Sequence, residues 1–240
     1  RGVRHRLRRV PARGSQSLKD WTPAAALNNA HWCDAVCRAY GRPGTFLPHM
    51  WVNAQAVPRF YPNAVSLRHD EVAIDEQLAT LDILARSNPP GRWAVKDSFA
   101  TLDLSRRGFD LLFDAQWIRQ LPLLIARTSS DLSWQRVETS DTFPAALFGD
   151  ANFAMFAGRR DDEVVAGGTL YRAEKIVGLS NVVAEPGDAV AVFRDLVALA
   201  SGLFPGLPIV GYESGNELKA AIDAGFQPGD DLRIWVRERQ

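Results

Sequence analysis

The sequence predicts an α/β protein built on a mixed sheet, and two observations carry this prediction. Between residues 132 and 237, strand patterns and helix patterns follow one another in a regular order, and residues 93–118 repeat part of that order. The chain has 240 residues, of which 46% are hydrophobic and 23% charged. It is therefore long enough to form one large domain or two small ones with full cores.

The first half of the chain is predicted to contain two long helices and several short strands. Residues 21–40 have helical spacing and stop at Gly41, and residues 71–86 return to the same spacing. A short helix is expected at about residues 100–106. Strands are predicted at residues 50–52, 64–67 and 93–95, and in a segment that runs through Ile118.

The second half has a clearer order of elements. Its longest helix is predicted at residues 189–203, with Val192 and Leu196 on one apolar face and Asp188 as the candidate N-cap. A later helix is expected to stop at Gly225, because glycine readily takes the left-handed conformation that ends helices. Strands are predicted at residues 134–137, 152–158, 164–171, 175–183, 208–212 and 231–236, with shorter helices at 142–147 and 216–224.

Two segments of the chain, residues 93–118 and 209–236, share one order of features. In each, a strand leads into an acidic residue followed by Ser, at residues 97–98 and 213–214. A helix then ends in Gly-Phe, and the next strand carries Trp followed by an aliphatic residue. Because these four features agree in spacing within one or two residues, they predict a divergent duplication.

The order of elements from residue 132 to residue 237 resembles that of the GNAT (N-acetyltransferase) superfamily. Three strands are followed by a long helix, a strand, a helix that ends in Gly225-Phe226, and a last strand. The resemblance implies a GNAT-like acyltransferase fold for residues 129–240. Through the repeat, it implies a degenerate GNAT-like half at residues 19–128.

The resemblance also implies where an acyl-CoA donor, acetyl-CoA by default, would bind. In a GNAT domain the fourth and fifth core strands run parallel but splay apart, and the pantetheine arm lies in the gap. Here those strands correspond to residues 175–183 and 208–212. Backbone groups of Asn181, Val182 and Val183 would then pair with the pantetheine amides, as in strand addition.

The phosphate-binding loop of the GNAT pattern is absent from this sequence. GNAT enzymes carry an Arg/Gln-x-x-Gly-x-Gly/Ala loop at the start of the long helix, where free amides and the helix dipole hold the pyrophosphate. Here residues 185–189 read Glu-Pro-Gly-Asp-Ala, so Pro186 removes a donor and two carboxylates replace it. Gly187 is the one glycine left. Arg194 would supply positive charge, and Asn216 completes the predicted donor-binding set.

The usual catalytic acid is also missing. Family members often carry a Tyr four residues before the glycine of Gly-Phe, and Ala221 occupies that position here. The resemblance leaves Tyr212, Glu213 and Ser214, at the end of the fifth strand, as the catalytic candidates. Tyr212 or Ser214 would protonate the leaving thiolate, and Glu213 would take a proton from the amine. Capping of the following helix is the structural alternative for residues 213–214.

Composition restricts the partners. The formal net charge is zero, so no long-range attraction to nucleic acid or to an anionic membrane is expected. Six arginines crowd the first fourteen residues, and residues 1–18 are predicted to be a disordered basic tail, with a nucleic-acid-binding or partner-binding arm as the alternative. No apolar run reaches the roughly 18 to 20 residues that span a bilayer, so no membrane partner is expected.

The cysteines and aromatic residues leave structural readings open. Cys33 and Cys37 lie one helical turn apart, and no histidine cluster completes a zinc site. They indicate reduced thiols in a cytoplasmic protein, with no metal. An aromatic cluster in the first half would form either the wall of a hydrophobic pocket or part of the core. Its members are Tyr40, Phe46, Trp51, Phe60, Tyr61 and Trp93.

These features together predict a GNAT-type N-acyltransferase that moves an acyl group from acyl-CoA to an amine of a small molecule or peptide. The acceptor is expected to lie between the two halves. Two alternatives stay open. One is a non-catalytic GNAT-like module that binds a ligand or partner, and the other is a GNAT-fold transferase with a different donor, such as an aminoacyl-tRNA. The oligomeric state and the acceptor are not specified by the sequence.

Overall fold

The computed structural model describes residues 21–87, 91–124 and 127–238, and it forms one mixed eleven-stranded sheet in the order β1-β2-β3-β4-β11-β5-β10-β9-β8-β7-β6. The predicted basic tail, residues 1–18, lies outside the described residues. The strands are β1 (Thr45–Phe46), β2 (Met50–Val52), β3 (Ala64–Ser66), β4 (Trp93–Asp97), β5 (Asp110–Gln120), β6 (Ser133–Arg136), β7 (Phe153–Arg160), β8 (Glu163–Ala173), β9 (Ile176–Ala184), β10 (Ile209–Glu213) and β11 (Gln227–Arg237). The helices are α1 (Thr22–Ala39), α2 (Glu71–Arg86), the 3-10 helix η1 (Ser105–Arg107), α3 (Ala145–Phe148), α4 (Ala189–Leu203) and α5 (Gly215–Asp223).

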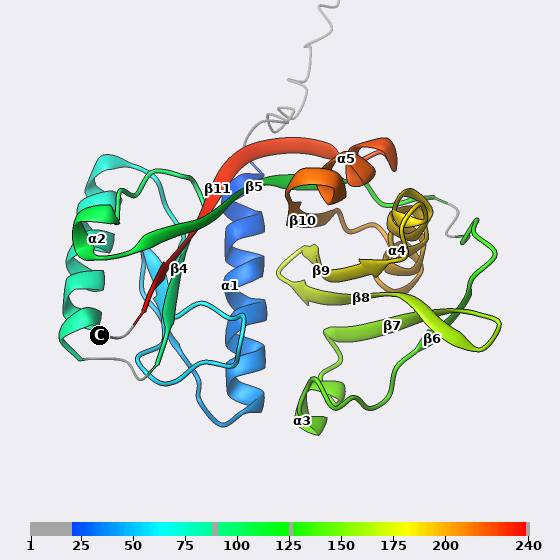
Figure 1. The fold of residues 1–240 in the computed structure, drawn as a ribbon, viewed down its shortest axis with the longest axis horizontal. Coiled ribbons are helices and arrows are strands. Elements are labelled where there is room, and N and C mark those ends of the chain that lie inside the picture. Colours follow the sequence, from blue (N-terminus) through cyan, green and yellow to red (C-terminus); the bar gives the residue numbers. More distant parts are fainter. Residues whose placement is uncertain (1–20, 88–90, 125–126, 239–240) are drawn as a thin grey trace, which may run out of the picture.

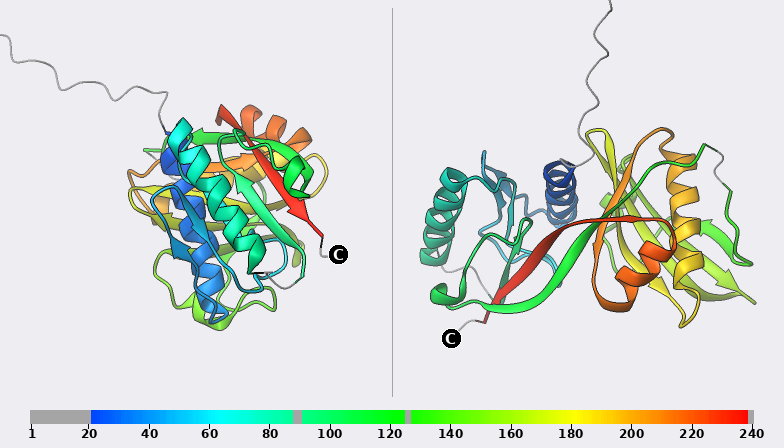
Figure 2. Two further views of the ribbon diagram at one scale, coloured as in Figure 1. Left: turned by 90° about the vertical axis from the view of Figure 1, so that its left-hand side faces the viewer. Right: turned by 90° about the horizontal axis from the view of Figure 1, so that it is seen from above.

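Three helices mark out the length of the molecule. Helix α1 lies in the middle, with α2 at one end and α4 at the other (Figures 1 and 2). Helix α1 is buried along most of its length because small residues such as Ala25, Ala26 and Ala30 let the neighbouring strands approach it closely. It therefore joins the two predicted halves through packing on both sides, contacting β3 as well as β8 and β9.

The core of the second half lies between α4 and the sheet. Val192, Leu196 and the neighbouring Phe193 are fully buried in one apolar cluster. A Cβ on Gly168 of β8 would come within 2.8 Å of Leu196, so this glycine allows the helix to pack close to the strand. The predicted amphipathic helix and the predicted mixed sheet are both confirmed.

Each predicted half contributes a strand to the other. Strand β4 pairs with β11, and β10 pairs with β5, in both cases antiparallel. The long strands β5 and β11 pair with each other between these two (Figure 1). The duplication itself and the boundary at residues 128–129 stay predictions.

Some short elements differ from the expectation. The helix predicted at residues 100–106 is only the three-residue η1, and the one predicted at 142–147 begins at Ala145. Pro144, in extended conformation, precedes it, and proline suits a position just ahead of the first helical turn. The predicted stop at Gly225 is confirmed by its φ of +110°. Across the described ranges, no helix combines the length and the apolar character needed to cross a membrane.

Candidate active site

Strands β9 and β10 run parallel but stay together over only two residue pairs. Val177 pairs with Ile209 and Gly178 with Val210, whereas β9 continues to Ala184. Among the described residues, no further ladder pair joins these strands. Backbone N–H and C=O groups along the facing edge of β9 therefore lack a strand partner and are available to a ligand.

A bulge in β9 lies just beyond the point where the strands part. The pairing of β8 with β9 shifts register between Gly167 and Thr169, and Asn181 has a φ of +51°. Asparagine is one of the few residues that tolerate this left-handed conformation. Its side-chain amide donates to Thr169 Oγ1 at 2.9 Å, which holds the bulge in place. A bulge re-aims the backbone and side chains that follow it.

A cavity of about 230 Å³ opens where the two strands separate. Both predicted halves contribute to it. From the first half come residues of α1, the loop before β3 and β4, and from the second half come β9 and β10. The lining residues are Asn29, Trp32, Cys33, Phe60, Tyr61, Pro62, Lys96, Leu179, Ser180, Asn181, Val182, Tyr212 and Glu213.

Glu213, the last residue of β10, brings a titratable carboxylate into this cavity. Burial and, to a smaller extent, the nearby carboxylate of Glu217 together raise the pKa of Glu213 to about 7. Both protonation states are then populated near neutral pH, which is the requirement for a group that takes up and releases a proton.

Tyr212 lies beside a buried lysine that the sequence reasoning missed. Lys96 Nζ is 3.0 Å from Tyr212 Oη and 2.7 Å from Asn29 Oδ1, and it lies 4.3 Å from the centre of the Tyr212 ring. Because an ammonium group has no acceptor, Lys96 must donate, and the hydroxyl proton of Tyr212 is left for another group. The signal that could have found Lys96 is the repeat, in which it precedes Asp97 as Tyr212 precedes Glu213.

Solved structures with a similar fold cover almost the whole chain. The GCN5-related N-acetyltransferase from Kribbella flavida is 13% identical with a TM-score of 0.60, over 90% of this chain and 96% of that one. A putative acetyltransferase from the GNAT family, from Novosphingobium aromaticivorans, is 12% identical with a TM-score of 0.52, over 87% and 99%. The chain has the GNAT fold. The predicted fold is thereby confirmed, on a likeness that includes both halves.

The likeness concerns the fold alone at these identities. A functionally unknown conserved protein from Staphylococcus epidermidis is similar as well, at 8% identity and a TM-score of 0.55, over 82% of this chain and 93% of that one. No protein-family model matches the sequence, and a search of curated proteins finds no match. β9, β10 and α4 are the elements predicted from the sequence as the splayed fourth and fifth core strands and the long helix of a GNAT domain.

The start of α4 differs from what the GNAT pattern and the capping rule suggest. Asp188 is the N-cap residue of α4, as predicted, but its side chain makes no cap hydrogen bond, so the predicted contact with the helix amides is absent. Its carboxylate instead accepts from Arg160 at 2.9 Å, and Glu185 accepts from the same guanidinium at 3.2 Å. Asp131 accepts from it too. Three carboxylates against one arginine leave this corner negatively charged, which disfavours a polyanion.

The remaining predicted residues lie apart from the cavity. Ser214 is the N-cap residue of α5, in line with the capping alternative, but its side chain makes no cap hydrogen bond. Asn216 is exposed on the first turn of α5. Arg194 Nη2 donates to the carbonyl of Asp223 at 2.9 Å, at the end of α5. Gly187, with a φ of +96°, has open space where a Cβ would be. The structure therefore brings Tyr212, Glu213, Asn181 and Val182 together but not these four.

A second cavity continues along β9 from the bulge toward α4. It has a volume of about 580 Å³ and runs from Asn181 past Val183 to Pro186, over β7 and β8. Its walls include the apolar side chains of Phe143 and Met155. Because Asn181 lines both cavities, the two adjoin along β9, and we call them together the β9 path. It leads from the first cavity, which holds Tyr212 and Glu213 and is called the reaction cavity, to the start of α4.

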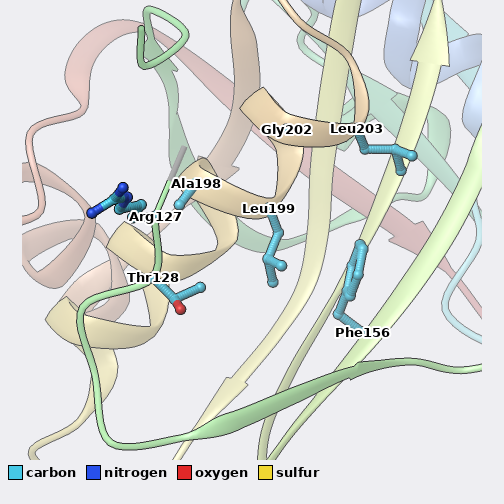
Figure 3. A pocket seen from close by; sticks show the side chains of 7 residues that line it. All are labelled: Arg127, Thr128, Phe156, Ala198, Leu199, Gly202 and Leu203. Carbon is cyan, nitrogen blue, oxygen red and sulfur yellow. The ribbon is translucent and has the colours of Figure 1, made fainter. Parts of the chain in front are cut away.

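A third groove, of about 630 Å³, lies between α4 and Phe156 of β7 (Figure 3). None of the predicted site residues lines it. The segment beside it is held by the buried carboxylate of Asp195, which accepts from Ser129 N at 2.7 Å and from Trp134 Nε1 at 2.8 Å. These bonds account for Asp195 as a structural residue.

Some residues of the predicted aromatic cluster line a pocket and others belong to the core. Phe60 and Tyr61 line the reaction cavity, whereas Trp51 and Trp93 are buried in separate apolar clusters. Burial raises the pKa of the Cys33 thiol, so this cavity residue is a poor nucleophile. Throughout the part of the chain that the structure describes, no group of His, Cys, Asp and Glu side chains is placed to hold a metal ion.

Proposed function

We propose that this protein is an N-acyltransferase that takes its acyl group from acyl-CoA, with acetyl-CoA as the default donor, and transfers it to an amine. One observation carries the proposal. Strands β9 and β10 part at Gly178, and the gap opens into a cavity that holds Tyr212 and Glu213. The GNAT fold supports the reaction class, since its named neighbours are acetyltransferases.

The free edge of β9 supports the binding of the donor. Beyond Gly178 its backbone groups can bond the two amides of a pantetheine arm in the manner of an added strand. Backbone N–H groups at the Asn181 bulge are suited to polarise a carbonyl oxygen, because they are fixed before the substrate arrives. Acyl-CoA supplies the activated thioester carbonyl.

Glu213 and Tyr212 supply the proton transfers. The amine nitrogen attacks the thioester carbon, and the carboxylate of Glu213 takes the proton that the nitrogen loses, directly or through water. When the carbon–sulfur bond breaks, the hydroxyl of Tyr212 gives its proton to the leaving sulfur. The bond from Lys96 to the Tyr212 oxygen favours this step, since it stabilises the negative charge that the oxygen acquires.

Titration calorimetry of the full chain with acetyl-CoA and with longer acyl-CoAs tests the donor. Saturable binding of at least one of them is expected. Release of free thiol from that acyl-CoA, followed with a thiol reagent in the presence of amines, then tests the transfer. An absence of binding up to millimolar acyl-CoA would refute the proposal.

A non-catalytic GNAT-like binding module is the second candidate, and the acidic start of α4 favours it. Glu185, Asp188 and Asp131 surround Arg160, where GNAT enzymes hold a pyrophosphate. Such a module would bind a ligand in the cavity without thiol release from any acyl-CoA. Thiol release that depends on Glu213 would exclude it.

A further inference from the structure

Lys96 is the most unusual charged residue of the reaction cavity. It projects from β4 toward α1, and only 3% of its surface is exposed. An ammonium group donates three hydrogen bonds. Two go to neutral oxygens, Asn29 Oδ1 and Tyr212 Oη. Because Lys96 also lines the cavity, the third can be made to a molecule inside it.

No carboxylate neutralises this ammonium from within the described ranges, where no ion pair of Lys96 is found within 4.0 Å. Two acidic residues on the elements that carry Lys96 and its partner Asn29 have other hydrogen-bond donors. Asp34 accepts from Trp51 Nε1 and Gly44 N, and Asp97 accepts from Leu102 N. Glu213 shares the cavity, but burial and Glu217 raise its pKa, whereas a lysine ion pair would lower it.

A buried charge without a counter-charge is strongly unfavourable. Lysine is almost never fully buried unless it is paired, because leaving water costs far more than two neutral hydrogen bonds return. A protein keeps such a group when a ligand supplies the missing charge, as part of the exchange of stability for function. The partner missing from Lys96 is therefore an anionic group that enters the cavity.

We propose that Lys96 binds a carboxylate of the acceptor, so that the acceptor is a small amino carboxylate such as a free amino acid. This inference rests on the proposed function, because it takes Glu213 as the group that meets the amine of the same molecule. The volume agrees with it. A cavity of about 230 Å³ is smaller than the roughly 300–1,000 Å³ of drug-sized sites and suits a molecule with few atoms between amine and carboxylate.

Paired ligands test the inference on the unmodified protein. The twenty free L-amino acids and β-alanine are compared with their carboxamides, which keep the amine and lose the negative charge. Thermal shift and calorimetry on the full chain are run at pH 7, with and without CoA. At least one amino acid is expected to bind about tenfold or more tightly than its carboxamide, as for a hydrogen bond between charged groups. Equal affinities across all pairs would overturn the proposal.

Variants of two lysines locate the effect. Lys96→Met is expected to remove the preference for the carboxylate and to leave the melting temperature unchanged or higher, because the variant removes an uncompensated buried charge. Lys175→Met, at an exposed position in the turn before β9, is the control and keeps the preference. If Lys96→Met melts at a lower temperature and still prefers the carboxylate, the role of Lys96 is structural and the proposal is wrong.

This test and that of the proposed function can fail separately. If no acyl-CoA binds while amino acids bind through Lys96, the transferase proposal falls and the carboxylate site stands. An acyl-CoA could instead bind and release thiol only when the acceptor amine carries no carboxylate. In that case the transferase proposal stands and the inference about Lys96 falls.

Discussion

The two ends of the β9 path are built in opposite ways. At the reaction end, Lys96 and its partner Asn29 are buried, and Tyr212 and Glu213 are partly buried. At the α4 end, Arg160 and the carboxylates of Glu185 and Asp188 form ion pairs at the surface. At the reaction end β9 and β10 separate as the GNAT resemblance predicts, while at the α4 end acidic residues stand where that pattern has its phosphate loop.

The buried polar groups at the reaction end are fixed, whereas the surface ion pairs at the α4 end can exchange partners. Surface ion pairs contribute about 0–1 kcal/mol each, so an incoming anion can displace the carboxylates from Arg160 at little cost. Buried polar groups are held by their neighbours and cannot rearrange as easily. Changes at the reaction end should therefore alter the rate of transfer, and changes at the α4 end should alter donor affinity.

The largest effect is expected for Glu213→Gln. Loss of a general base lowers kcat/KM by about 10²- to 10⁴-fold with little change in acyl-CoA affinity. In the wild type, the rate should rise with pH through about 7, since only the ionised Glu213 accepts a proton. Steady-state thiol release between pH 5.5 and 8.5 measures both effects.

Glu217→Gln is the matched control for Glu213. Its carboxylate lies on the exposed first turn of α5 and raises the pKa of Glu213. The variant should keep the maximal rate and move the pH–rate limb to lower pH. If the rate of Glu213→Gln still rose with pH through about 7 as in the wild type, another group would be the base.

Tyr212→Phe should have the next largest effect, a loss of about 10- to 100-fold in kcat, because the leaving sulfur no longer receives a proton from a fixed donor. KM for acyl-CoA should change less than kcat. Tyr40→Phe removes an exposed hydroxyl bonded to the Thr142 carbonyl and should leave both constants unchanged. If Tyr212→Phe raised KM by a similar factor and left kcat unchanged, its hydroxyl would be assigned to binding.

Sequence patterns were sufficient where neighbours in the chain decide the structure. The apolar face of α4 and the stop at Gly225 follow from local spacing and from glycine's freedom, and both are confirmed. The cap hydrogen bond predicted for Asp188 is absent, because its carboxylate accepts from Arg160, at the end of β7, instead. Local rules cannot register a competitor that folding brings from elsewhere in the chain.

For the same reason, the sequence does not predict that Lys96 and Asn29 of the first half lie in the reaction cavity. Lys96 meets Asn29 and Tyr212 across separations of 67 and 116 residues, through pairings of β4 and β10 that no local pattern specifies. The separation of β9 from β10 was reached only through the resemblance to GNAT proteins. Tyr212 and Glu213 were found because they end a strand, a position that sequence alone can identify.

At the α4 end, the double variant Glu185→Gln, Asp188→Asn should tighten acetyl-CoA binding about three- to tenfold at low salt. The change removes two of the three carboxylates that bond Arg160, which leaves more of its charge for the phosphates and removes two repelling charges. S-acetylpantetheine, which has no phosphate, should bind equally to both proteins, and the gain should shrink as salt screens the charges. Asp161→Asn, in the exposed turn after β7, is the control. Unchanged acetyl-CoA affinity would place the phosphates away from α4.

The smallest effect concerns stability and returns to Glu213. Its pKa of about 7 in the folded protein lies above the 4.5 of the free side chain, so the folded state favours the protonated form. The resulting stability is complete below pH 4.5 and is lost as pH rises through about 7. Glu213→Gln cannot ionise, so it should match the wild type near pH 4.5 and exceed it in stability at pH 8, which is seen as a melting temperature several degrees higher. A gap of constant size from pH 4.5 to pH 8 would mean that burial does not oppose the charge on Glu213, and the carboxylate would then lack the shifted pKa that its role at the reaction end requires.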